Sequence, residues 1–178
     1  MSFSGNIKEE LAQHYGRARH CQLAELSAIL HMCGEFSEDS KGVCTLKFHT
    51  ENLPVARKCF TLMEKTFNIK TGIVIRKNPS RGSQSCFLYW KGDELLAVKN
   101  TIVQAVCCKR AYIRGAFLAA GSMSDPRKSY HFEIVCNSEE AASYLRDMIN
   151  SFDMDAKIVQ RKKTSVVYLK EGEQIATF

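Results

Sequence analysis

The chain has 178 residues, a formal net charge of +6, 45% hydrophobic residues and 25% charged residues. Such a composition is ordinary for one large globular domain or two closely packed halves, and its modest basic excess permits an anionic partner without demonstrating one. No apolar run approaches the ~20 residues of a membrane helix, and the first residues lack the apolar core of a signal peptide, so we expect a cytoplasmic protein with no membrane partner. Eight cysteines without a CxxC pair are then expected as reduced thiols.

The first half of the chain predicts a regular alternation of helices and strands. A helix around Leu23–Cys33 ends at Gly34, where a left-handed glycine is favoured. The expected elements that follow are a strand at Gly42–His49, an amphipathic helix at Leu53–Phe67 capped by Asn52, strands at Gly72–Lys77 and Ser85–Trp90, and a helix at Asp93–Val106. Gly82 is expected in the turn between the two strands.

The second half predicts the same order of elements. A helix at Arg110–Ala120 ends at Gly121. The expected elements after it are a strand at Ser129–Cys136, a helix at Glu139–Phe152 capped by Ser138, and strands at Lys157–Lys162 and Ser165–Leu169. A last helix has barely begun when the sequence stops at Phe178, which predicts that the chain is a fragment of a longer protein.

Direct comparison of the two halves indicates an internal duplication. Cys21–Phe36 aligns with Cys108–Met123, so that Gly34 meets Gly121, and Thr66–Lys77 aligns with Ser151–Lys162. The order of these matches, more than any one of them, favours a single domain over residues 1–178 built from repeats at about 20–106 and 107–178.

Small residues recur at every fourth position of the two repeated helices. The rows that align are Ala24, Ala28 and Met32 in the first helix and Ala111, Gly115 and Ala119 in the second. A glycine inside a helix costs roughly 1 kcal/mol relative to alanine, a cost that close helix packing would offset. We therefore predict two central helices in contact, with Ala28 and Gly115 at their closest approach, under a single curved, mostly antiparallel sheet. The alternative is a pair of ordinary core helices.

The same helices resemble a known motif. Leu26–Gly34 (LSAILHMCG) and Ile113–Gly121 (IRGAFLAAG) resemble the LAGLIDADG helix of homing endonucleases. More narrowly, the opening MSFSGNIKEEL and the stretch RAYIRGAFLAAGSMSDPRKSYHFEIV resemble the WhiA transcriptional regulators of Gram-positive bacteria, over nearly all of the chain.

The resemblance implies an α/β, pseudo-twofold LAGLIDADG-like fold and, in the full-length protein, a C-terminal helix-turn-helix domain. That family controls sporulation and cell division, and its sequence-specific contacts to double-stranded DNA are then expected mainly from the C-terminal domain. This chain is expected at the nucleoid as a scaffold that adds non-specific DNA contacts or, alternatively, binds another regulatory protein.

Catalysis is not expected, because the residues that carry it in the resembled nucleases are replaced. Active members have an acid before the terminal glycine of each helix, whereas this chain has Cys33 and Ala120. Mg²⁺ prefers oxygen ligands, which neither residue offers. Glu35 would point about 100° away and Asp125 suits a turn, so neither is a substitute. We expect no enzyme activity, no cofactor and no small-molecule substrate, with an active endonuclease as the least favoured alternative.

One further cluster is an alternative candidate for metal binding. His20-Cys21 and Cys107-Cys108 begin the two repeated helices, where a thiol and imidazole zinc site is conceivable. Adjacent cysteines are poor chelators of one ion and are often simply small buried residues, so no metal is assigned.

Basic residues concentrate in equivalent strand segments of the two repeats. The candidate DNA-binding residues are Arg76, Lys77, Arg81, Arg161, Lys162 and Lys163. Strand alternation places Arg76 and Arg161 on the open face of the sheet if the helices cover the other face. Lys and Arg give affinity for phosphate without reading sequence. Basic strands also protect sheet edges, and that alternative stays open. Phe87, Tyr89, Trp90 and Tyr168 could stack on bases, although core packing is favoured for most of them.

Overall fold

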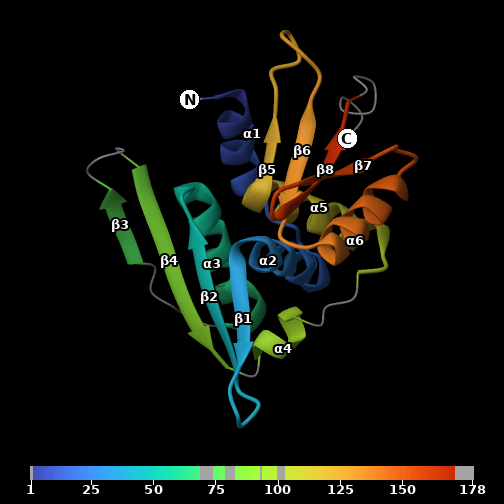
Figure 1. The fold of residues 1–178 in the computed structure, drawn as a ribbon. Helices are drawn as coiled ribbons and strands as arrows, with labels where there is room; N and C mark the ends of the chain where they lie inside the picture. Colours follow the sequence, from blue (N-terminus) through green and yellow to red (C-terminus); the bar gives the residue numbers. More distant parts are fainter. Residues whose placement is uncertain (1, 69–73, 79–82, 93, 100–102, 171–178) are drawn as a thin grey trace. The chain divides into compact units, whose positions relative to one another are not determined.

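The computed structural model describes residues 2–68, 74–78, 83–92, 94–99 and 103–170. The chain divides into two compact units (Figure 1). The larger unit is Glu9–Ala119, and the smaller unit combines Met1–Lys8 with Ala120–Phe178. Helix α1 (Phe3–Ala12) begins in the smaller unit and ends in the larger one. Within the described ranges, no helix has the length and apolar character needed to cross a membrane.

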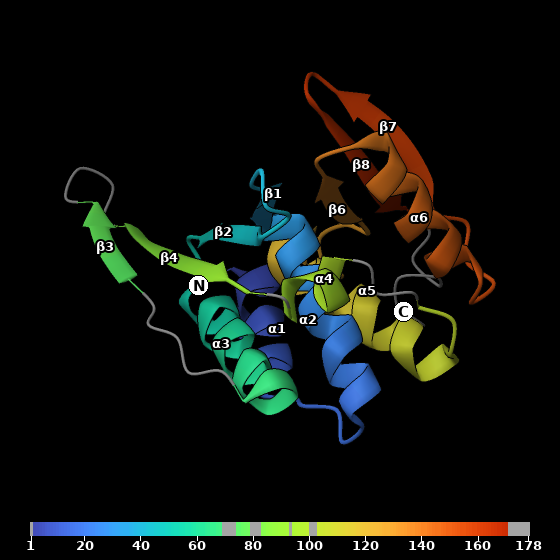
Figure 2. The same ribbon diagram turned by 90° about the horizontal axis from the view of Figure 1, so that it is seen from below.

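The larger unit packs helices on one face of a four-stranded antiparallel sheet ordered β1-β2-β4-β3. Its elements are α2 (Arg19–Cys33), β1 (Gly34–Glu38), β2 (Cys44–Thr50), α3 (Leu53–Phe67), β3 (Val74–Asn78), β4 (Ser83–Lys91), α4 (Glu94–Lys99) and α5 (Val106–Ala120). Figure 2 shows α2 and α3 on the same side of the sheet. Leu46 and Phe48 of β2 point to that side and join the core with Leu26 and Leu62, as strand alternation requires.

The smaller unit repeats this strand order in a second antiparallel sheet, β5-β6-β8-β7. Its elements are β5 (Gly121–Met123), β6 (Phe132–Cys136), α6 (Glu139–Asn150), β7 (Lys157–Arg161) and β8 (Thr164–Leu169). Phe132 and Ile134 of β6, Leu145 of α6 and Val167 of β8 are buried and form its core. The Ser138 hydroxyl accepts from the Ala141 N–H and caps α6, as Asn52 caps α3 by accepting from Val55.

The predicted mixed fold with antiparallel strands is confirmed, but the strands form two sheets, one in each unit, in place of the single sheet expected. The prediction of a left-handed Gly34 is wrong. Gly34 is extended, with φ −114° and ψ 157°, and begins β1 directly after α2. A Cβ at this position would lie 2.5 Å from both the Leu30 carbonyl oxygen and the Leu46 Cδ1, so glycine is needed for space and not for a left-handed turn. Helix α4 is also shorter than the predicted Asp93–Val106, and the predicted turn at Gly82 lies outside the described residues.

Helices α2 and α5 meet along the row of small residues within the larger unit. Gly115 faces the backbone of α2, where a Cβ would contact the Glu25 carbonyl oxygen and lie 3.0 Å from the Ala28 Cβ. Ala24, Ala28 and Ala111 are each at most 1% exposed. Met32 is buried and Ala119 half-buried at the far end of the same row. Glycine therefore permits an approach that any side chain at position 115 would prevent.

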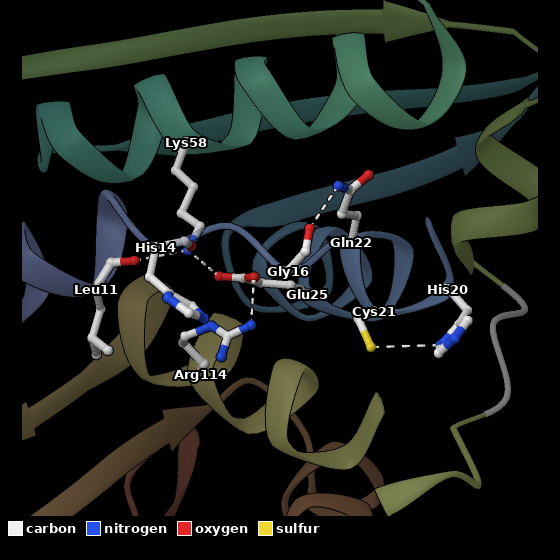
Figure 3. Close-up of polar contacts among 9 residues, drawn as sticks. All are labelled: Leu11, His14, Gly16, His20, Cys21, Gln22, Glu25, Lys58 and Arg114. Carbon is white, nitrogen blue, oxygen red and sulfur yellow. Dashed lines mark hydrogen bonds and ion pairs between the residues drawn. The ribbon is translucent and has the colours of Figure 1, made fainter. Parts of the chain in front are cut away.

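A buried cluster of three charges lies beside this helix contact (Figure 3). The Glu25 carboxylate on α2 contacts the Lys58 ammonium of α3 and lies 3.1 Å from Nη2 of Arg114 on α5. The side chains of Glu25 and Lys58 are both 0% exposed. Lys58 also donates to the backbone carbonyls of Leu11, at 2.8 Å, and His14. Burial lowers the pKa of Lys58, and the Glu25 charge counteracts part of this effect.

Gly115→Ala is expected to lower the free energy of unfolding by about 1–3 kcal/mol, and Gly115→Leu by more than about 2 kcal/mol, because each forces α2 and α5 apart. Chemical denaturation of the 178-residue chain measures both changes. Gly16→Ala is the matched control, since its Cβ would meet only the Cys21 Cβ, at 3.3 Å. Wild-type stability of the Gly115→Leu variant would contradict this packing.

Removing one member of the buried ion pair is expected to cost about 3–5 kcal/mol, because the partner charge stays buried. We expect this loss for Lys58→Met alone. The double variant Glu25→Gln/Lys58→Met should recover part of it, since the carboxylate is then gone as well. A double-mutant cycle by urea denaturation measures the coupling. Additive effects of the two substitutions would show that the pair is not coupled in the folded chain.

Candidate nucleic-acid interface

The positions that hold acids in active LAGLIDADG nucleases carry a thiol and a methyl group here. Cys33 is the last residue of α2 and is half-buried. Its thiol donates to the Ala119 carbonyl, with 3.5 Å between Sγ and oxygen. Ala120 is the last residue of α5 and is half-buried. These two side chains offer no oxygen atom to a divalent cation.

The two acids considered as substitutes, Glu35 and Asp125, lie in different surroundings. Glu35 is exposed on β1 and lies opposite Lys47 in the register of β1 and β2. Asp125 accepts hydrogen bonds from the Arg127 guanidinium at 2.8 and 3.1 Å and from the Arg127 backbone N–H at 3.0 Å. The Arg127 guanidinium holds the pKa of Asp125 at about 2. Asp125 therefore stabilises a turn, in agreement with its position before Pro126.

The face of the first sheet that points away from α2 and α3 combines basic and aromatic side chains. We call this set the first outer face; its exposed members are Lys47 and His49 of β2, Arg76 of β3, and Phe87, Tyr89 and Lys91 of β4. In the register of the sheet, Lys47 lies opposite Tyr89 and His49 opposite Phe87, whose ring centroids are 4.8 Å apart. The Arg76 guanidinium lies 5.3 Å from the centre of the Phe87 ring. Among the described strand residues, the only acid on this face is Glu35 on the edge strand β1.

Not all of the residues expected in the first half can be placed on this face. Arg76 is exposed and belongs to it. Lys77 is the next residue of β3, and its side chain is outside what the structure describes, as is all of Arg81. Trp90 is 5% exposed and packs on Phe67 on the inner side, with ring centroids 5.7 Å apart, so it belongs to the core.

The equivalent face of the second sheet has a different charge balance. Arg161 ends β7 and is exposed, but its Nη2 lies 3.3 Å from the Glu133 carboxylate. Burial alone would raise the pKa of Glu133. The hydrogen bond with His131, at 3.0 Å, and the Arg161 charge outweigh that effect and lower it. Glu133 is thus ionised and neutralises Arg161. Tyr168 is half-buried on the neighbouring strand, with the Lys170 ammonium 5.4 Å from its ring.

Two predicted basic residues lie in the tight turn between β7 and β8. Lys162 and Lys163 are both exposed there. Lys162 has φ 41°, in the left-handed region that costs a side-chain-bearing residue roughly 1 kcal/mol or more. The turn therefore presents two lysines beyond the Arg161–Glu133 pair.

Sequence reasoning misses Lys47 and His49 of the first outer face. The signal is present in CTLKFHT, in which Leu46 and Phe48 alternate with Lys47 and His49. A search for runs of basic residues overlooks it, because on a strand the residues of one face occupy every second position.

A separate group of potential metal ligands lies at the opposite end of the helix pair from Cys33. His20 and Cys21 in the first turn of α2 lie next to Cys107 and Cys108 in the first turn of α5. It is the one such group of three or more ligands in the part of the chain that the structure describes.

Comparison with known proteins gives matches along most of the chain. Residues 19–97 match the family model of the WhiA N-terminal LAGLIDADG-like domain, and residues 109–178 match that of the WhiA LAGLIDADG-like domain. A probable cell division protein WhiA from Lachnoclostridium phytofermentans is 48% identical, over 98% of this chain and 63% of its own length. One from Alkaliphilus metalliredigens is 39% identical, over 98% of this chain and 62% of its own length. This chain therefore spans less than two thirds of either relative.

Solved structures give the same fold. A crystal structure of the N-terminal LAGLIDADG domain of WhiA superposes with a TM-score of 0.85 at 24% identity, over 99% of this chain and 87% of that one. Full-length WhiA from Thermatoga maritima gives a TM-score of 0.80 at 24% identity, over 98% of this chain and 59% of that one. The homing endonuclease I-DmoI, in complex with DNA and Mn, gives 0.63 at 12% identity, over 89% of this chain and 94% of that one. With both family models matched in order and with relatives of this similarity, the chain belongs to the WhiA family.

Proposed function

We propose that this chain is the non-catalytic LAGLIDADG-like part of a WhiA-type transcriptional regulator of cell division and sporulation, and that it contacts duplex DNA weakly and without sequence preference. The name of the relatives as cell division proteins and the DNA-bound neighbour of the same fold support the proposal. We further propose that sequence-specific binding belongs to a C-terminal helix-turn-helix domain in the full-length protein. A role on DNA implies the cytoplasm as its location.

The observation that carries the DNA-binding proposal is the composition of the first outer face. Lys47, Arg76 and Lys91 supply positive charge on three adjacent strands. Phe87 and Tyr89 are 37% and 62% exposed between them. Cations attract phosphates through release of counterions, and aromatic rings pack on sugars or on exposed bases. Contacts of these two kinds do not depend on the identity of the base, so the binding proposed is sequence-tolerant.

A second candidate function, binding of another regulatory protein, is favoured by the outer face of the second sheet. There, Val166 pairs with Val135 on one side and with Val159 on the other; Val159 is 40% exposed and Val135 is half-buried, whereas Val166 is buried. Arg161 is neutralised by Glu133 on the same sheet. The accessible valines Val135 and Val159 beside a paired cation suit a protein surface better than a phosphate backbone.

The absence of oxygen ligands at Cys33 and Ala120 supports the non-catalytic part of the proposal. Hydrolysis of a phosphodiester by metal ions needs ligands held in fixed geometry. We expect no cleavage of plasmid DNA by this chain with Mg²⁺ or Mn²⁺, as measured by conversion of supercoiled to nicked DNA. Metal-dependent nicking that disappears in Glu35→Ala or Asp125→Ala would identify a substitute acid and reject the proposal.

We expect the chain to bind a labelled duplex with a dissociation constant of roughly 10⁻⁴ to 10⁻⁶ M at physiological salt, with affinity falling steeply as salt rises. Fluorescence anisotropy at several salt concentrations measures both quantities. Lys47→Ala/Arg76→Ala should weaken binding and reduce the slope of log affinity against log salt by about 2, because each substitution removes one cation that faces a phosphate. Stability should change little because both residues are exposed.

The matched control is Arg57→Ala/Lys65→Ala, which removes the same charge from exposed positions of α3, on the other side of the same sheet. We expect this control to retain nearly wild-type affinity and slope. Equal weakening in the two double variants would reduce DNA binding to a net-charge effect. No detectable binding by the wild-type chain at low salt would favour the protein-interaction scaffold.

A further inference from the structure

The first turns of α2 and α5 bring together three thiols and one imidazole within the larger unit. The ligand atoms of His20, Cys21, Cys107 and Cys108 all lie within 4.8 Å of one another. Nδ1 of His20 lies 3.0 Å from Sγ of Cys108, 3.5 Å from Sγ of Cys21 and 4.0 Å from Sγ of Cys107. Figure 3 shows His20 and Cys21 side by side at the start of α2.

The distances from His20 to the three sulfurs bracket the edge length of a tetrahedral zinc site. With zinc–sulfur bonds of about 2.3 Å and zinc–nitrogen bonds of about 2.0–2.1 Å, nitrogen and sulfur ligands lie about 3.6 Å apart and two sulfurs about 3.8 Å apart. The three distances from His20 lie on both sides of the first value. A set of three cysteines and one histidine is also a composition that structural zinc sites use.

The objection that adjacent cysteines chelate one ion poorly is met by the arrangement of the two helices. Each helix contributes one adjacent pair, so four ligands approach from two directions. His20 aligns with Cys107, and Cys21 with Cys108, in the internal repeat. The ligand pairs therefore occupy equivalent positions in the two halves, which would place an ion on the local symmetry axis between the helices.

The electrostatic surroundings favour thiolates once a cation is bound. Without one, burial and the neighbouring thiols raise the pKa of Cys21 to about 11 and also raise that of Cys108, so an incoming ion must displace protons. The first turn of each helix directs partial positive charge at the cluster, which stabilises a negatively charged thiolate complex. His20 and Cys107 are exposed, so an ion can enter from solvent.

We propose that His20, Cys21, Cys107 and Cys108 form a structural Zn²⁺ site that joins the first turns of α2 and α5. Zn²⁺ displaces three thiol protons and receives a lone pair from Nδ1 of His20, and no electrons are transferred. The four-ligand shell leaves no position for substrate, so the ion stabilises the fold and catalyses nothing.

The test is zinc content and cobalt spectroscopy of the whole chain, purified under reducing conditions with zinc present. We expect one Zn²⁺ per chain by elemental analysis, and Co²⁺ should give the visible bands of a tetrahedral thiolate site. Loss of a residue that only hydrogen-bonds to a metal ligand weakens metal binding by about 10- to 100-fold. Cys21→Ser and Cys108→Ser each remove a direct ligand, so each should weaken Zn²⁺ binding by more than that. A chelator should lower the Tm of the wild type and leave that of Cys108→Ser unchanged.

Cys33→Ser is the matched control, because it removes a half-buried thiol at the other end of α2 and should retain the full zinc content. The Co²⁺ titration of the wild type keeps the test decisive if a ligand variant does not fold. Zinc content near zero in the reduced wild type, or unchanged content in folded Cys108→Ser, would overturn the proposal. A disulfide between the two helices, with no metal uptake after reduction, would overturn it as well.

Discussion

Glu25 combines two constraints on which the larger unit depends. Its backbone carbonyl lies where a side chain at position 115 would have to go, so α2 and α5 can approach only because that residue is glycine. Its carboxylate is fully buried and contacts Lys58 and Arg114 from two other helices. Leaving the buried Glu25 charge without a partner would cost far more than losing one apolar neighbour. Lys58 and Arg114 are therefore held in fixed positions. The single residue therefore sets both the spacing and the orientation of the helices around α2.

Fixing the helix pair at its centre also fixes what lies at its two ends. At one end, Cys33 contacts the Ala119 backbone, and the side chains that would hold a hydrolytic metal in the resembled nucleases are absent. At the other end, the first turns bring four soft ligands within reach of each other. The chemistry of the ligands decides which ion each end could hold, since magnesium requires oxygen and zinc accepts sulfur and nitrogen. The same pair of packed helices therefore lacks the ligands of a hydrolytic metal site at one end and, by our proposal, holds a zinc site at the other.

The parts of the fold that the sequence predicts well are those with strong local signals. Helix α3 begins and ends at the predicted Leu53 and Phe67 because Asn52 caps one end and an amphipathic pattern runs to the other. Strands β1 and β5 are not predicted because GEFSE and GSM are too short and polar to show alternation, and their pairing partners, not their own residues, determine them. The Glu25 cluster escapes prediction for a related reason. Lys58 shares a helix face with Val55 and Leu62, which marks it as buried, but its partners on α2 and α5 are determined only by tertiary packing.

The two sheets have the same topology, but their outer faces differ in charge. In their registers, Lys47 lies opposite Tyr89 in the first sheet, and Glu133 lies opposite Tyr168 in the second. Tyr89 directly precedes Trp90, and Tyr168 directly precedes Leu169. Trp90 and Leu169 are the last buried residues of their strands. Lys47 and Glu133 therefore occupy equivalent positions with opposite charge. Glu133 also neutralises Arg161, the residue that aligns with Arg76 in the internal repeat. Inner residues of a duplicated fold are constrained by packing, whereas outer residues can change charge at little cost to stability. The duplication therefore does not imply two equal halves of a binding surface.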